Sequence, residues 1–188
     1  MGTLPFEFYY GACGTFLFDG DERVMLCFAY NDSQKCFRSQ LNIFIVFVKM
    51  IYYSYNGERY KNHPRSVNNH YLTTLGNIEN KILAVGDGGN NNEGNNKVEL
   101  FDINSNSWTT KTSFPFSSTK ICCYGTVSRE SSVLIIGGWI DGGETSLITK
   151  YTVDKWERIG NLQDKRHAHR AIINDNRIYV VGGRHRRL

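Results

Sequence analysis

The stretch VLIIGGW, Val133–Trp139, decides how the chain folds, and RIYVVGGR, Arg177–Arg184, repeats its pattern. Each stretch places a run of aliphatic residues directly before two consecutive glycines. A short apolar run bounded by turn residues predicts a buried strand. Glycine at its end indicates a place where the backbone needs a positive φ or approaches another segment closely. The sequence therefore contains the same strand junction twice.

A polar turn precedes each of these strands, and a further strand precedes the turn. Residues 171–173 lead into Asn174-Asp175-Asn176 and then into the strand, which is a hairpin signal. The same order occurs over residues 124–139, 71–89 and, more faintly, 14–30. Ile82, Val133 and Ile178 hold corresponding places at spacings of 51 and 45 residues. Such spacings match the repeats of about 40 to 50 residues that build propeller blades.

The two middle repeats also have a second half, in which an aromatic residue is followed shortly by tryptophan. Phe101 precedes Trp108, and Tyr151 precedes Trp156, with turn residues between the members of each pair. Each repeat is therefore predicted to be a four-stranded antiparallel meander. Many Tyr, Phe, Val, Ile and Thr residues favour strands as well, and we expect an all-β protein.

Aliphatic residues that end in Gly-Gly, followed by Tyr or Phe and then Trp, resemble the Kelch motif. The resemblance implies a β-propeller, a wheel of about 4 to 8 four-stranded blades. It also implies a connecting element of Arg and then His, present once in full at residues 166–169 and lacking at Ile121 and Tyr124 of the preceding repeat. The motif residues, for which we expect a structural role, are Gly137, Gly138, Gly182, Gly183, Trp108, Trp156, Tyr151, Phe101, Arg166 and His169.

The repeats predict one domain, an incomplete propeller of three to four blades over residues 1–188. We expect the blades at about 11–62, 63–112, 118–160 and 164–188, the last of them incomplete. Residues 41–53 are an insertion in the first blade or, alternatively, its third and fourth strands. Because an open stack of blades leaves strand edges exposed, we expect the chain to be part of a longer protein.

Composition narrows the classes of function. The 188 residues are 40% hydrophobic and 13% aromatic, as in a globular protein, and the net charge is only +4. One short basic run, residues 184–187, is a weak nucleic-acid signature, so no nucleic-acid partner is predicted. Residues 41–55 are apolar but shorter than the roughly 20 residues that a bilayer requires, so no membrane span is predicted. No secretory signal is visible at the N-terminus.

Five cysteines are present, and none are spaced as in a zinc ribbon. Cys27 and Cys36 flank a turn signal and are predicted to face each other across neighbouring strands, where a disulfide would close in an oxidising compartment. Cys122 and Cys123 are adjacent, and adjacent cysteines rarely bond to each other. Free thiols are the favoured interpretation for all five.

Two other groups of residues are candidates for a site. His167 and His169 are spaced to lie on one side of a strand, as metal ligands would be, but the sequence places no third ligand, and a connecting-loop role is favoured. The Asn- and Gly-rich residues 88–96 predict a flexible loop. The corresponding loop of the next repeat contains Trp139, Asp141 and Glu144, and it is the predicted partner-binding loop.

We therefore expect a protein-interaction module that presents its inter-strand loops to a protein partner, with no catalytic residue, cofactor or metal. The alternative is a copper-dependent oxidase or sugar-acting enzyme, because galactose oxidase shares the Kelch-type propeller. No nucleophile elbow, P-loop or dinucleotide fingerprint is present. Likeness of fold alone does not predict enzymatic activity.

Overall fold

The structure is a computed structural model, and it describes residues 12–18, 21–29, 32–38, 61–62, 64–68, 70, 73–86, 96–129 and 131–184. Within these ranges the side chains are described from Pro64 onward. The regular structure of the described residues consists of strands, and all the pairings are antiparallel. The all-β prediction is confirmed. In this part of the chain no helix is long and apolar enough to cross a membrane.

Three four-stranded sheets follow one another along the chain, each with its strands in sequence order. Sheet I consists of β1 (Ala12–Phe18), β2 (Asp21–Ala29), β3 (Asp32–Arg38) and β4 (Lys61–Asn62). Sheet II consists of β5 (Gly76–Ile78), β6 (Lys81–Val85), β7 (Val98–Asp102) and β8 (Ser107–Lys111). Sheet III consists of β10 (Gly125–Arg129), β11 (Ser132–Ile136), β14 (Leu147–Thr152) and β15 (Lys155–Asn161).

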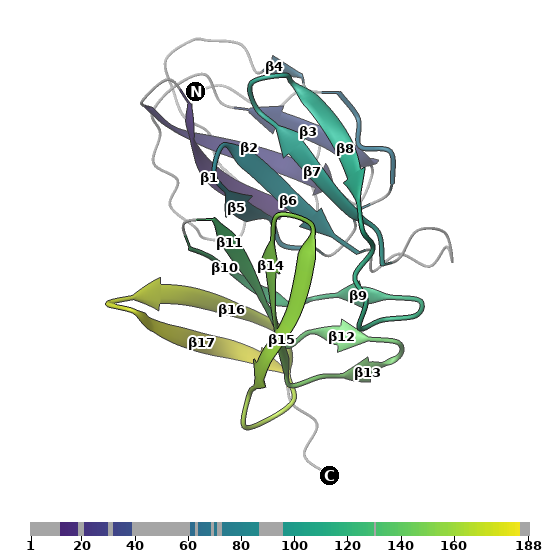
Figure 1. The fold of residues 1–188 in the computed structure, drawn as a ribbon, viewed down its shortest axis with the longest axis vertical. Helices are drawn as coiled ribbons and strands as arrows, with labels where there is room; N and C mark the ends of the chain where they lie inside the picture. The colour runs from purple at the N-terminus through teal and green to yellow at the C-terminus, as the bar shows by residue number, and fades with distance from the viewer. Residues whose placement is uncertain are drawn as a thin grey trace.

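Two smaller elements complete the described fold. β16 (His167–Asn174) and β17 (Arg177–Arg184) pair as hairpin IV. β9 (Ile121–Cys122), β12 (Trp139–Ile140) and β13 (Gly143–Glu144) form a ribbon that extends from the end of β11. Figure 1 shows sheets I and II together, sheet III beyond them, and hairpin IV and the ribbon on either side of sheet III.

Sheet I differs from its sequence-based description in one respect. Its third strand is β3, which pairs with β2, and its fourth is β4. The alternative in which residues 41–53 supply these two strands is therefore wrong, since β3 ends at Arg38. Whether 41–53 is an insertion lies outside the described residues. The register pairs Cys27 with Cys36, so the prediction that they face each other across neighbouring strands is confirmed for the backbone.

The predicted turns join the strands of each hairpin. Asp175 and Asn176 connect β16 to β17 with φ values of 47° and 61°. Positive φ at both central residues is typical of the tight turn that matches the twist of two paired strands. Asn and Asp tolerate this backbone region better than most residues do. Asp154, with φ of 61°, serves in the same way between β14 and β15.

Sheet III is covered on both faces, and this explains its continuous aliphatic strand. Val133 and Ile135 of β11 belong to the core shared with sheet II, whereas Leu134 and Ile136 belong to a second core shared with hairpin IV. Because successive side chains of a strand point to opposite faces, a strand with one solvated face would alternate apolar and polar residues. β11 is apolar at consecutive positions because it has no solvated face.

The first strands of successive units pack against one another. β5 contacts β1 on one side and β10 on the other, and β10 in turn contacts β16. Glycine is the first residue of both β5 and β10. A Cβ atom on Gly76 would collide with Val133, and one on Gly125 would lie 2.9 Å from Nε2 of His169. The sheets therefore approach one another closely along their first strands.

Candidate functional site

The aromatic motif residues form cross-strand pairs at the same place in sheets II and III. Phe101 lies opposite Trp108 with ring centroids 5.2 Å apart, and Tyr151 lies opposite Trp156 at 4.8 Å. Phe101 and Tyr151 are buried, whereas both tryptophans are half-buried. The Trp156 ring also stacks edge-on against Phe114, at 5.0 Å, in the core between the sheets. These side chains pack within and between sheets II and III, and Tyr151 also lines a cavity together with Lys81 and Asp102.

The paired glycines all have positive φ, but the two pairs differ in position. Gly137 and Gly138, with φ of 55° and 108°, directly follow β11, as predicted. Gly182 and Gly183, with φ of 72° and 89°, lie inside β17 and do not end it. β17 continues because it still pairs with β16 at Arg184, which lies opposite His167.

The connecting residues lie at the junctions between sheets. Tyr124 donates a hydrogen bond of 2.6 Å from its hydroxyl to the carbonyl of Val85, the last residue of β6, and its burial raises the pKa of the phenol. His169 holds the corresponding place beside Gly137, at the end of β11. Burial lowers the pKa of His169, and the nearby charge of Arg166 acts in the same direction. Tyr124 therefore stands at the position where the sequence pattern of this repeat lacks the connecting histidine.

Arg166 bonds from its guanidinium to the Gly182 carbonyl at 3.3 Å, across hairpin IV, and its own carbonyl accepts a hydrogen bond of 2.8 Å from the Gly138 amide. Both motif residues of the connecting element, Arg166 and His169, therefore contact the glycine pairs. Arg166 and His169 therefore link hairpin IV to the end of β11 in sheet III. The interpretation of this element as a connection fits the geometry.

The predicted partner-binding loop forms the ribbon, and Asp141 is its anchor. The Asp141 carboxylate accepts six hydrogen bonds of 2.8–3.1 Å from amides and hydroxyls of residues 117–120. Desolvation raises the pKa of this carboxyl, but the bonds from the amides of Ser118 and Lys120 outweigh it and hold the pKa far below its usual value. Asp141 therefore fixes the loop around itself, and its carboxylate is already satisfied by that loop.

Trp139, Glu144 and His167 gather at the base of the same ribbon. Trp139 and Glu144 are register partners of β12 and β13. The Glu144 carboxylate lies 3.1 Å from Nδ1 of His167, and the Trp139 ring meets the imidazole edge-on at 5.1 Å. The structure thus brings two of the three predicted loop residues together and joins them to hairpin IV through His167.

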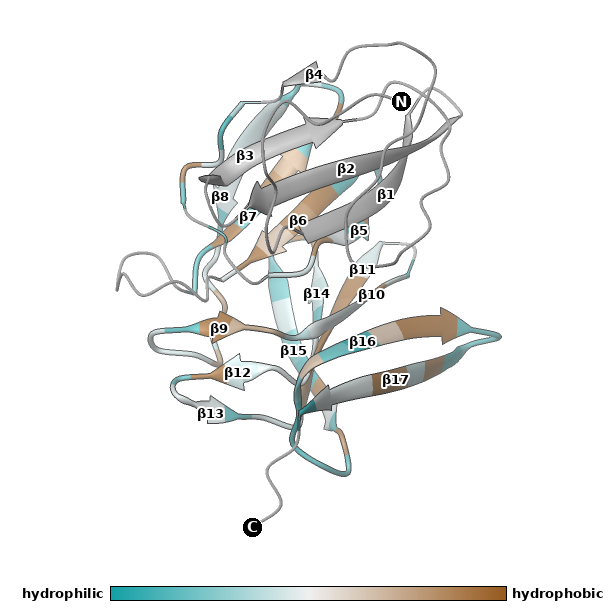
Figure 2. Cartoon of the chain, turned by 180° about the vertical axis from the view of Figure 1, so that it is seen from behind, coloured by the Kyte–Doolittle hydropathy of each residue, from teal (hydrophilic) through white to brown (hydrophobic). Residues whose placement is uncertain are grey.

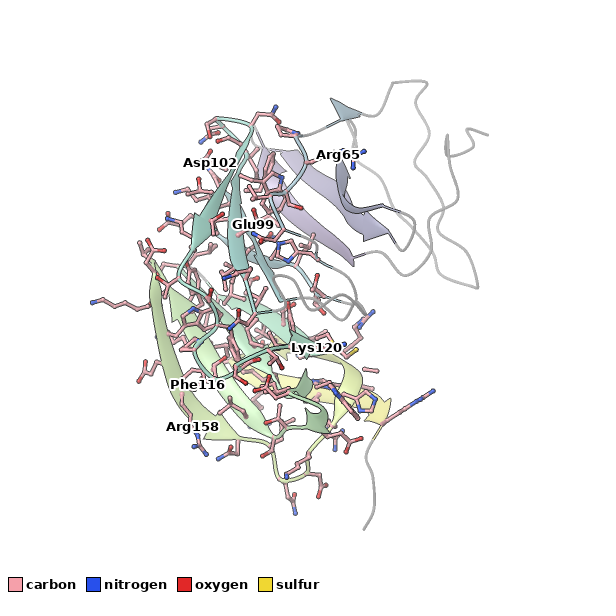
Figure 3. All side chains as sticks on the ribbon, turned by 90° about the vertical axis from the view of Figure 1, so that its right-hand side faces the viewer. Arg65, Glu99, Asp102, Phe116, Lys120 and Arg158 are labelled. Atoms are coloured by element: carbon pink, nitrogen blue, oxygen red, sulfur yellow. The ribbon has the colours of Figure 1, made fainter. Side chains whose placement is uncertain are left out.

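A second polar cluster, missed by the sequence analysis, joins β7 of sheet II to the segment that precedes β5. Glu99 of β7 is buried and bonds to Nε2 of His70 at 2.8 Å, while Nδ1 of His70 lies 2.9 Å from the Gly86 carbonyl. The Glu99 carboxylate also accepts the amides of Val67 and Asn68 at 2.9 Å. Burial raises the pKa of Glu99, but the hydrogen bond from His70 and those from the amides outweigh it and lower the pKa. Glu99 is labelled on this sheet in Figure 3. Glu99 holds the segment that enters sheet II.

Among the described residues, no group of three or more His, Cys, Asp and Glu side chains is placed to hold a metal ion. His167 and His169 contact different partners, Glu144 and Gly137 respectively. The Asn- and Gly-rich loop lies outside the described residues apart from Asn96, whose amide donates to the Ser117 carbonyl at 2.9 Å.

No protein-family model matches the chain, and no curated protein matches it.

Proposed function

We propose that the chain is part of a Kelch-type β-propeller, in which sheets I to III and hairpin IV are successive blades. The first strands of the four units contact one another in sequence order, as the innermost strands around a propeller channel do. Among the described strands, the most extensive contacts between units join neighbours along this line, which is typical of repeat proteins.

Repeated contacts between units support the same architecture. The indole of Trp108 donates to the carbonyl of Pro64 at 2.9 Å, and the indole of Trp156 donates to that of Thr112 at 3.4 Å. Each tryptophan thus bonds to a carbonyl 44 residues earlier, and the two bonds are 48 residues apart along the chain. A repeating contact at a repeating interval indicates copies of one structural unit.

For such a propeller we propose binding of a protein partner through the ribbon and the residues around it. The observation that carries this proposal is the set of six hydrogen bonds to Asp141, which holds an exposed loop in one arrangement. A loop ordered before binding loses less conformational entropy on binding. Lys120, labelled in Figure 3, and the half-buried Trp139 lie in this region and supply a cation and an aromatic ring. Tryptophan is enriched among the residues that contribute most to binding at protein interfaces.

A matched pair of substitutions tests this proposal. Gly142 at the ribbon tip and Gly182 in β17 are both exposed, have positive φ of 90° and 72°, and have open space where a Cβ atom would lie. Gly142→Arg therefore obstructs the ribbon, and Gly182→Arg imposes a similar backbone cost elsewhere. Immobilised full-length chain is incubated with cell extract, the captured proteins are identified, and each candidate is purified for direct measurement of its Kd.

The proposal predicts a partner whose Kd rises at least about tenfold with Gly142→Arg, a loss of about 1.4 kcal/mol, and stays unchanged with Gly182→Arg. Circular dichroism of both variants establishes that they are folded. If a purified partner binds both variants with equal affinity, it does not bind at the ribbon, and the proposal is wrong.

A further inference from the structure

Cys122 and Cys123 bring two sulfur atoms together beside the ribbon. A hydrogen bond joins their Sγ atoms at 3.4 Å, and neither residue forms a disulfide. Cys123 has a positive φ of 57°, an uncommon conformation for a residue with a side chain. Cys122 is buried and Cys123 is half-buried, so Cys123 is the more exposed residue of the pair.

The pair is better suited to share one bound atom than to form a disulfide. The Cα atoms of adjacent residues are about 3.8 Å apart across a trans peptide bond. A disulfide usually needs Cα atoms at least about 4.4 Å apart, so bonding these two sulfurs to each other would strain the backbone. A bridging atom needs no such approach, because the sulfurs remain separated when each binds it.

The sulfur separation is also compatible with a single bridging atom. With bonds of about 2.3 Å, as in zinc thiolates, two sulfurs lie about 3.4 Å apart at an angle of roughly 95° and about 3.8 Å apart at the tetrahedral angle. The observed 3.4 Å corresponds to the narrower angle. A linear two-coordinate ion would need the sulfurs on opposite sides. A pyramidal centre with three bonds, such as trivalent arsenic, fits the separation.

The number of available ligands also favours trivalent arsenic over zinc. Structural zinc uses four protein ligands, and no described group of three or more His, Cys, Asp and Glu residues could hold a metal ion. An arsenical with one organic substituent needs only two sulfurs, since its third bond is to carbon. The pair of thiols therefore satisfies it completely.

The surroundings favour the thiolate form of Cys123, the more exposed residue of the pair. The hydrogen bond with Cys122 lowers the pKa of Cys123, and the charge of Lys120 acts in the same direction against the effect of burial. The thiolate is the form that attacks and ligates. Cys123 would therefore react first, and Cys122, already 3.4 Å away, would close the chelate ring.

We propose that Cys122 and Cys123 form a bidentate binding site for monosubstituted trivalent arsenicals. In the reaction with an arsenoso compound, R–As=O, both S–H bonds and the As–O bonds break, two As–S bonds form, and the oxygen leaves with the two protons as water. Arsenic stays trivalent and no oxidant is required. The site lies at the junction with hairpin IV, since the Cys123 carbonyl accepts the Ala168 amide at 2.7 Å.

Phenylarsine oxide tests the site on the full-length chain. Because the chain has three other cysteines, the experiment uses the C13S/C27S/C36S variant, in which only the adjacent pair remains. Native mass spectrometry measures the arsenical bound per chain, and reaction with an aromatic disulfide reagent counts the thiols left. We expect one arsenical bound, both thiols lost from the count, and release by excess dithiol but not by an equal concentration of monothiol.

Single substitutions separate chelation from simple thiol reactivity. Adding Cys122→Ser or Cys123→Ser to the same background leaves one thiol, and the affinity should fall at least about 100-fold, because the second bond is no longer intramolecular. Circular dichroism checks the fold of each variant. Affinity within tenfold of the two-thiol protein in either single variant would overturn the proposal. So would the absence of binding to a folded two-thiol protein, or recovery of the pair as a disulfide.

Discussion

Replacing Gly137 by alanine tests why the aliphatic strand ends in glycine. Two costs are expected at this position. Its φ of 55° belongs to the left-handed region, which costs a residue with a side chain about 1 to 2 kcal/mol. In addition, the new Cβ atom would lie 2.9 Å from the Arg166 carbonyl and 2.9 Å from Cε1 of His169. Overpacking of this kind costs about 1 to 3 kcal/mol. Gly137→Ala should therefore reduce the free energy of unfolding by about 2 to 5 kcal/mol.

Gly182→Ala is the matched control, because it introduces the unfavourable backbone conformation without the steric overlap. Gly182 has a similar φ of 72°, and no atom lies within 4 Å of where its Cβ would stand. Its free energy of unfolding should fall by about 1 to 2 kcal/mol. The lower entropy of alanine in the unfolded chain affects both variants alike and cancels in the comparison.

Urea denaturation of the two variants, followed by tryptophan fluorescence and far-ultraviolet circular dichroism, gives both free energies when the two probes coincide. The difference between the variants isolates the packing of hairpin IV against sheet III. Losses that agree within about 0.5 kcal/mol would mean that backbone conformation alone requires the glycine. The close contact of Gly137 with Arg166 and His169 would then carry no energetic weight.

Three further substitutions follow from the buried and anchored groups. Glu99→Gln should cost about 3 to 5 kcal/mol in urea denaturation, because it leaves a buried histidine without its carboxylate. Tyr124→Phe removes the bond to the carbonyl of Val85 and should cost about 1 to 3 kcal/mol by the same assay, whereas an unchanged midpoint would contradict that bond. Asp141 has a lowered pKa, so the stability that its carboxylate contributes is present above the usual carboxyl pKa near 3.8 and is lost as the pH falls below that value. Asp141→Asn should therefore lower the Tm at pH 7 and make the Tm less sensitive to acidification, which a series of Tm measurements against pH would show.

Local patterns in the sequence were enough to predict most strands and turns. The aliphatic run before Gly137, the turn at Asp175 and Asn176, and the aromatic pairs of β7–β8 and β14–β15 all occur where they were expected. Each signal is contained in a few consecutive residues whose backbone preferences and side-chain alternation are their own. β3 was indicated only by the prediction that Cys36 faces Cys27 across neighbouring strands, because its residues, DSQKCFR, lack a strong apolar run.

The candidate site was predicted only in part, because it depends on residues distant in sequence. Trp139 and Glu144 were selected from loop composition, but their contact with His167 comes from the approach of hairpin IV to the ribbon. Asp141 was selected as a partner contact, and the structure shows its carboxylate anchoring residues 117–120. No pattern near Asp141 indicates that a segment more than 20 residues earlier would supply its hydrogen-bond donors.

The exposed face of hairpin IV illustrates the same division. Alternation within the sequence predicts two faces, and the inner one packs Ala171, Ile173 and Val180 against sheet III. The outer one leaves Ile172 58% and Val181 64% exposed. Figure 2 shows apolar residues along both strands of the hairpin, so hydropathy alone does not distinguish the two faces. Packing against sheet III makes that distinction.

The sequence by itself determined the repeating unit: which residues form strands, where the turns occur, and where glycine must follow an aliphatic run. Those features depend on steric and hydrophobic preferences that act over a few residues. Only the tertiary structure decided which groups meet between units, such as Tyr124 with Val85, and the His70–Glu99 pair within one. Such contacts depend on how closely the sheets approach and at what register, which is set by the packing of whole faces and is not encoded in any one stretch of residues.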